Sequence, residues 1–504
     1  LSSAASDVYK RQIDFSGKNK KADYFISAGY LNDKGVFSIQ RFERYSTRAN
    51  LNYNVNKWLK VGTNISLSHS VREGSASDQT VWLLRTMPTV YPIYEWDSAT
   101  NAYRLDKNGN RIFDYGNYRT SWSGTNPLAD DTYNKSPWTH DDVSNRTYFE
   151  ITFIPGLKWR TNFSVDFYQY NYDGYVNSEY GFAAGYKGSA YKESDRNLSY
   201  TINNLLTYEK SFGDHSLSVL LGQEAYALEY KLLSAEKQGF PFPGVTEIGS
   251  AAVMSSMNSY TDKYRLLSWL SRVEYDYKDR YYISGSFRTD GSSRFHPDNR
   301  WGQFWSLGGS WRISNEEFMK PYSSWLDNLK LRASYGSLGN NTLGDNRDKD
   351  GNYMSQSMFA QTNYVLGRTV VNGLSQTAIA NADLTWETTY ITNIGVDYGL
   401  FGNRFSGSIE YFDKRTKGIL IDLPAPMVHG NATVPKQNSA KVSNRGIEFT
   451  TSWNDKIGKD FSYNVGFNFT YIKNNVDKFK GGDASYDGAR MPVSYTHLTL
   501  PTIR

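Results

Sequence analysis

The stretch at residues 278–318 decides the fold class, and it reads KDRYYISGSFRTDGSSRFHPDNRWGQFWSLGGSWRISNEEF. From position 281 its side chains alternate between an apolar or small set and a mostly polar set. The first set is Tyr281, Ile283, Gly285 and Phe287, and the second is Tyr282, Ser284, Ser286 and Arg288. A period of two is typical of a β-strand with two different faces.

The alternation resumes after a Gly-Ser-Ser turn and a Pro-Asp-Asn loop. Trp305, Leu307 and Trp311 then share one face of a second predicted strand. Ser314 and Glu317 follow at the spacing of a capping box, which predicts a short helical turn before the next strand. The unit is therefore strand, loop, strand and helical turn.

Residues 280–295 (RYYISGSFRTDGSSRF), the W-x-x-x-W strand and the NEEF sequence after it resemble the barrel signature of the SusC/RagA family of TonB-dependent outer-membrane transporters. Three later segments agree with it in order. They are LKLRASYGSLGNN from Leu329, LTWETTYITNIGVDYGLFGNRFSGSIEYFDKRTKGIL from Leu384 and SNRGIEFTTSW from Ser443. The resemblance covers about residues 14–479 and implies an outer-membrane β-barrel.

Composition is compatible with that fold. Aromatic residues make up 16% of the 504 residues, mean hydropathy is −0.62, and no run approaches the ~18 apolar residues that a membrane helix needs. A barrel strand needs only one apolar face, so low hydropathy does not exclude a barrel. The absence of cysteine excludes disulfides and thiolate chemistry. A net charge of +5 is too small to indicate a nucleic-acid partner.

The two ends do not continue the strand pattern. Residues 1–12 (LSSAASDVYKRQ) and 493–504 (VSYTHLTLPTIR) resemble translated adapter sequence, and we predict that both are non-native tails. Residues 13–492 are then a partial barrel. A plug domain is expected before residue 13, and further strands are expected after residue 492.

About fifteen strands are predicted between these ends, and short turns alternate with long inserts along the chain. The long inserts are residues 71–144, 170–195, 230–263, 338–383 and 416–440. In an up-and-down antiparallel sheet this alternation places all short turns at one end, as in outer-membrane barrels. A Greek-key sandwich would mix the lengths. A plugged barrel of about 22 strands would leave about seven strands outside this chain.

Two sets of residues are candidates for the functional surface. The aromatic residues of the long inserts could stack on sugar rings, or they could pack the loops together. The polar rows of the strands would line the lumen, where charged side chains also serve as ordinary polar filling. The aromatic candidates are Trp96, Trp122, Trp138 and Tyr353, and the lumen candidates are Arg288, Arg312, Lys330 and Arg332.

Evidence for a metal site or a catalytic site is weak. Asn346, Asp348 and Asp350 have the spacing of the first half of a calcium loop, but Ser357 replaces the twelfth-position Glu, so a plain polar loop is the alternative. The six histidines form no close pair. We therefore expect no enzyme activity and no cofactor other than this calcium candidate.

The resemblance implies import of oligosaccharides, or of peptides, across the cell outer membrane. It also implies two protein partners besides outer-membrane lipid and the ligand: a TonB complex that supplies energy through the plug domain, and a SusD-like surface lipoprotein. Two alternatives stay open from the residues alone. One is a passive porin, and the other is a cell-surface β-rich adhesin or glycan-binding protein.

Overall fold

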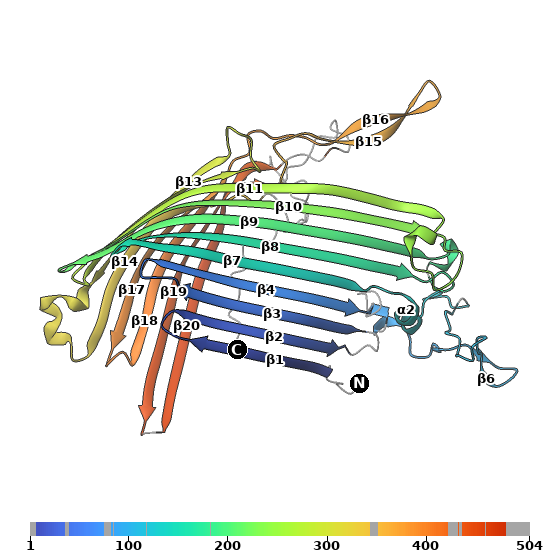
Figure 1. Cartoon of the computed structure of the whole chain (residues 1–504), viewed down its shortest axis with the longest axis horizontal. Helices are drawn as coiled ribbons and strands as arrows, with labels where there is room; N and C mark the ends of the chain where they lie inside the picture. The colour runs from blue at the N-terminus through green and yellow to red at the C-terminus, as the bar shows by residue number, and fades with distance from the viewer. Residues whose placement is uncertain are drawn as a thin grey trace. The chain divides into compact units, whose positions relative to one another are not determined.

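The computed structural model describes residues 7–35, 40–74, 82–83, 85–116, 118–181, 183–342, 351–421, 432, 436–458 and 460–479. Sixteen strands form one antiparallel sheet in which each strand pairs with its neighbours along the chain (Figure 1). This order confirms the predicted all-β, up-and-down fold. The two edge strands of the described sheet are β1 and β20.

The bounds of the sixteen strands are as follows: β1 (Asp7–Lys18), β2 (Ala22–Lys34), β3 (Arg41–Asn54), β4 (Leu59–Glu73), β7 (Trp138–Ile154), β8 (Leu157–Val176), β9 (Ser189–Phe212), β10 (His215–Gln238), β11 (Val253–Tyr277), β12 (Tyr281–Ser292), β13 (Trp301–Arg312), β14 (Leu326–Asn340), β17 (Glu387–Leu400), β18 (Phe405–Ile421), β19 (Gln437–Ile457) and β20 (Phe461–Phe479).

The remaining described elements are short and lie between these strands. They are the pair β5 (Trp96–Asp97) and β6 (Ala102–Tyr103), the pair β15 (Met358–Leu366) and β16 (Thr369–Ala378), the helix α2 (Pro127–Tyr133), and the 3-10 turns η1 (Ala184–Tyr186), η2 (Ile248–Ser250), η3 (Ile313–Asn315) and η4 (Glu317–Tyr322). None of the helices in the described part of the chain is long and apolar enough to span a membrane.

The sheet has one strand more than the fifteen predicted, and that strand is β1. Its twelve residues pair with β2 from Asp7 opposite Lys34 to Lys18 opposite Asp23. The strand pattern thus begins earlier than predicted, because backbone pairing with β2 does not require clean alternation of side chains. The non-native origin of residues 1–12 stays a prediction.

Connections alternate as predicted. Seven connections of two to four residues lie at one end of the strands, and longer ones lie at the other, apart from the short links before Arg41 and around Pro297. Only the β13–β14 connection is long at the short-turn end. It contains the predicted helical turn as η3 and η4, but Ser314 does not cap it, because the Ser314 hydroxyl oxygen is buried without a hydrogen-bond partner.

The chain divides into two compact units. One comprises Leu1–Glu150, Asn162–Ile202 and Ala227–Lys263, and the other comprises Ile151–Thr161, Asn203–Tyr226 and Tyr264–Arg504. Each has a small buried apolar cluster built from strand and loop residues. In the first it is built on Tyr175 and Phe240, and in the second on Phe295 and Leu384.

The strands of the second unit expose their apolar face. Ile283 and Leu307 are 57% and 58% exposed, whereas the polar side chains of Arg332 and Glu410 are 33% and 19% exposed. A water-soluble sheet covers its apolar face instead. An exposed apolar band opposite a covered polar row is the arrangement of a barrel that faces lipid outside and water inside.

Candidate functional site

The polar face of the second unit carries an arginine that joins three strands. Arg332 on β14 donates from Nε to Asp397 Oδ1 at 3.1 Å and from Nη2 to Glu410 Oε2 at 2.6 Å. Gly395 lies between Arg332 and Glu410 in the strand register, and a Cβ at this glycine would be 2.9 Å from Arg332 Cζ. The missing side chain of Gly395 therefore opens the path along which Arg332 reaches Glu410.

A second arginine of the polar face has a similar role. Arg288 on β12 donates from Nε to Asp290 Oδ1 at 2.6 Å, and from Nη2 to Ser268 Oγ at 2.9 Å and Glu224 Oε1 at 3.2 Å. One guanidinium group thus bonds a carboxylate on its own strand, a hydroxyl group on β11 and a second carboxylate on β10. Such charge-assisted bonds fix the Arg288 side chain on the polar face of the strands.

The other two predicted lumen cations meet at one tyrosine. Lys330 Nζ and Arg312 Cζ lie 4.5 and 5.5 Å from the centre of the Tyr282 ring. Asp279 accepts hydrogen bonds from Arg312 and from the Tyr282 hydroxyl group. The structure therefore brings Arg312 and Lys330 together, while Arg288 has different partners.

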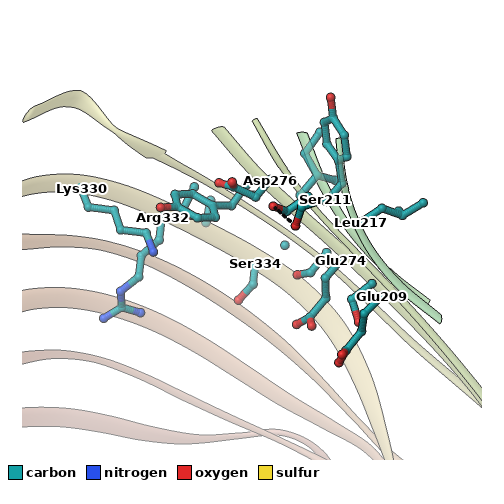
Figure 2. A pocket seen from close by; sticks show the side chains of 18 of the residues that line it. Glu209, Ser211, Leu217, Glu274, Asp276, Lys330, Arg332 and Ser334 are labelled. Atoms are coloured by element: carbon teal, nitrogen blue, oxygen red, sulfur yellow. Dashed lines mark hydrogen bonds between the residues drawn. The ribbon is translucent and has the colours of Figure 1, made fainter. Parts of the chain in front are cut away.

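Lys330 and Arg332 also border a pocket of about 640 Å³ on this face (Figure 2). Glu209, Glu274 and Asp276 line it as well, and Figure 2 shows Glu209 and Glu274 on the side of the pocket away from the two cations. The β13 wall contributes Gly308 and Gly309, which occupy little space. The pocket therefore presents opposite charges to whatever enters it.

In the first unit, a buried ion pair organises the connection between β4 and β7. Arg119 Nη2 lies 2.9 Å from Asp114 Oδ2, and the two side chains are only 1% and 6% exposed. Asn126 adds to this core, since its amide group donates to the Ile93 and Asp114 carbonyl oxygens at 2.9 and 3.0 Å. Because the Asp114 carboxylate, Arg119 Nη2 and the Asn126 amide group have partners within the loop, the long insert has a polar core of its own.

Asn126 also begins the helix α2. Its side-chain oxygen accepts from the backbone N–H groups of Leu128 and Ala129, and Pro127 occupies the first turn. This is the usual combination of an N-cap amide and a following proline.

Tyrosine rings and one carboxylate pack beside α2. Tyr180 stacks between Tyr115 and Tyr133, with ring centroids 5.3 and 5.6 Å apart. Burial raises the pKa of Asp130 to about 6, and burial together with the nearby Asp130 carboxylate raises the pKa of Tyr115. Asp130 is therefore the loop group whose charge changes in the mildly acidic range.

The structure does not gather the predicted loop aromatics into one cluster. Trp96 is 49% exposed and meets Tyr103 edge-on, with ring centroids 4.9 Å apart. Trp122 packs on Trp82 at 4.6 Å. Trp138 begins β7, and its nearest rings include Phe42 on β3 and Tyr170 on β8, both at 6.1 Å. Tyr353 belongs to the other unit. Their role in ligand binding stays a prediction.

The residues of the calcium candidate, Asn346, Asp348 and Asp350, lie outside the described residues. Within the described ranges, no three His, Cys, Asp or Glu side chains lie together as a metal ion requires. Calcium stays a prediction.

Sequence reasoning missed several residues of these clusters. The Asn126-Pro127 pair is a helix-start signal, and it lies outside the strand pattern on which the predictions rest. Nothing in the sequence indicated that Asp114 pairs with Arg119, or that Gly395 makes way for Arg332.

Comparison with known proteins gives a consistent result. The family model described as "TonB dependent receptor-like, beta-barrel" matches residues 94–500. The TonB-dependent receptor P3 of Formosa agariphila is 30% identical over 94% of this chain and 46% of its own length. The TonB-dependent receptor SusC of Bacteroides thetaiotaomicron is 28% identical over 94% of this chain and 47% of its own length.

A solved structure agrees with these relatives. The structure of the RagAB peptide transporter superposes with a TM-score of 0.77 at 27% identity, covering 94% of this chain and 51% of that one. The chain therefore spans about half the length of the relatives that it matches.

Proposed function

Because the chain belongs to the family of TonB-dependent receptor-like β-barrels, we propose that it forms much of the barrel of an active outer-membrane importer. Proteins of this family reside in the outer membrane and cross it with strands. The observation that carries the proposal is the inverted surface of β12, β13 and β14, with Ile283 and Leu307 exposed and Arg332 held on the opposite face. Such a surface suits lipid on one side and a wet lumen on the other.

In the complete protein, a plug domain would fill the lumen. The pocket beside Lys330 and Arg332 is a suitable contact for it, because cations and carboxylates face each other there. Arg288 and Arg312 would line the same inner wall. The charged groups of the pocket lose less hydration free energy against a polar plug than against an apolar one, because polar partners replace the water.

The imported ligand would be an oligosaccharide or a peptide. The RagAB peptide transporter supports a peptide, and the resemblance of the sequence to the SusC/RagA family supports an oligosaccharide. A SusD-like lipoprotein would help to capture the ligand above the long loops, and a TonB complex would supply energy through the plug. Trp96, Trp122, Trp138 and Tyr353 are the proposed stacking residues. Catalysis is not part of this function, which agrees with a family of transporters and receptors.

Uptake by whole cells tests active import against passive flow. The complete receptor is expressed with its lipoprotein, and labelled oligosaccharides or peptides are supplied with and without a protonophore. We expect accumulation to stop when the proton gradient is removed or the gene for TonB is deleted. Accumulation that continues at the same rate without the gradient would contradict the proposal and indicate a porin.

A further inference from the structure

The connection between β13 and β14, residues 313–325, differs from every other connection at the short-turn end. The others described there have two to four residues, whereas this one contains η3 and η4. A longer segment at this end needs a physical reason, because two to four residues are enough to join neighbouring antiparallel strands.

The start of this segment is bound to the apolar face of the strands. The Glu316 carboxylate accepts hydrogen bonds from the Tyr281 hydroxyl group, from Trp311 Nε1 at 3.0 Å and from Arg280 Nη1 at 3.1 Å. Glu316 is only 9% exposed as a result. Tyr281 and Trp311 lie opposite each other in register and belong to the apolar rows of β12 and β13. Glu316 thus fixes the segment to that face.

Two further bonds hold the segment in place. Asn315 Nδ2 donates to the Asp279 carbonyl oxygen at 3.0 Å. At the far end, the Phe401 backbone N–H donates to the Trp325 carbonyl oxygen at 2.8 Å. The segment is therefore attached to the neighbouring turns on both sides.

Between these attachments, large aromatic side chains are exposed. No residue of η4 is buried, and Phe318, Tyr322 and Trp325 are 60%, 49% and 44% exposed. The Tyr322 and Trp325 rings lie edge to face, with centroids 6.5 Å apart. A fixed segment that exposes three aromatic side chains marks an interaction surface.

We propose that residues 317–325 anchor the barrel in the periplasmic leaflet of the membrane, with Phe318, Tyr322 and Trp325 inserted between phospholipids. The surface is continuous with the apolar rows through Glu316, Tyr281 and Trp311, so lipid that covers those rows reaches the segment. Tyr and Trp favour the level of the headgroups. The proposal rests on the proposed function for the orientation of the barrel, with short turns toward the periplasm.

Single nitroxide labels test this anchor in the complete receptor, placed in a background without other cysteines and reconstituted in phosphatidylethanolamine–phosphatidylglycerol vesicles. The variants are Phe318→Cys and Tyr322→Cys, with Lys320→Cys as the matched control, because the Lys320 side chain is 72% exposed and polar. Leu307→Cys reports the apolar row itself. Collision rates with lipid-soluble oxygen and with a water-soluble nickel chelate are measured at each site.

The quantity compared is the ratio of the oxygen collision rate to the nickel collision rate. We expect this ratio to be at least threefold higher at positions 318 and 322 than at position 320. Nickel collisions at 318 and 322 that match those at 320 would overturn the anchor, and so would low collision rates with both reagents, which would indicate a protein cover. The Leu307 label separates the two proposals. A lipid-exposed label at 307 with water-exposed labels at 318 and 322 refutes only the anchor, whereas water exposure at all three refutes the membrane-spanning barrel.

Discussion

Two arginine clusters of this chain use their carboxylates in different ways. In the β4–β7 connection, the Arg119 and Asp114 side chains are 1% and 6% exposed, and they bind each other inside the folded loop. On the wall, Arg332 bonds Asp397 and Glu410 but remains 33% exposed. The difference indicates that the Arg119–Asp114 pair stabilises the fold of the loop. The charges around Arg332 instead remain accessible to a binding partner. The predictions below test this contrast.

The largest effect is expected when the loop pair is broken. Arg119→Ala leaves the Asp114 carboxylate buried without its cation, which costs about 3–5 kcal/mol. The loop should open locally, so hydrogen exchange at the Leu128 and Ala129 amides should accelerate. Arg111→Ala is the control, because the Arg111 side chain is exposed in the same loop and lies over the faces of Tyr94 and Tyr103. Unchanged protection in Arg119→Ala would contradict the assigned role.

A pH effect of about 2 kcal/mol is expected at Asp130. Its pKa rises to about 6 in the folded loop from an ordinary value of 3.8. The folded state then binds the proton more tightly, so the stability of α2 is highest below pH 4 and falls as the pH rises through 6. Asp130→Asn should remove this dependence and make α2 more stable at pH 7. Hydrogen exchange at pH 5 and pH 7 measures both, and an identical pH dependence in the two proteins would refute the assignment.

A smaller effect, about 1–2 kcal/mol, is expected from Gly395→Ala. The new methyl group would displace the Arg332 guanidinium and break its bond to Glu410. The control is Gly285→Ala, because the only atom near its Cβ is a backbone oxygen at 4.0 Å. Guanidinium unfolding of the reconstituted receptor should show a lower midpoint for the first variant alone. Equal midpoints would mean that the Arg332–Glu410 bond adds nothing to stability.

The smallest effect on folding is expected at Trp96, whose side chain is 49% exposed. Trp96→Ala should leave hydrogen exchange in α2 unchanged, yet weaken ligand binding by about 1 kcal/mol if the ring stacks on the ligand. Titration of the receptor–lipoprotein complex with ligand measures this. Trp122→Ala offers the contrast, because the loss of its packing on Trp82 should disturb the loop itself.

The strand segments with one apolar and one polar face could be predicted from sequence, because such segments, for example 281–288, alternate cleanly between apolar and polar side chains. Beyond such segments the signal fails. β11 begins at Val253, although its alternation is clear only from Leu267, and the β15–β16 hairpin exposes both faces. Where both faces of a strand meet water, no period of two is required.

The candidate site could be predicted only as a list of cations. Their partners depend on strand register, which placed Gly395 between Arg332 and Glu410 and placed Tyr282 beside both Arg312 and Lys330. Residues that are far apart along the chain meet there, so no local pattern reveals them.

The central claim is that the apolar face of the strands meets lipid and the polar face meets the lumen. The most direct test is a fluorescent-label scan along β12 of the complete receptor in vesicles, using Ile283→Cys, Ser284→Cys, Ser286→Cys and Phe287→Cys with a lipid-borne quencher. We predict strong quenching at 283 and 287 and weak quenching at 284 and 286. Equal quenching at all four positions, or stronger quenching at the serine positions, would contradict the account.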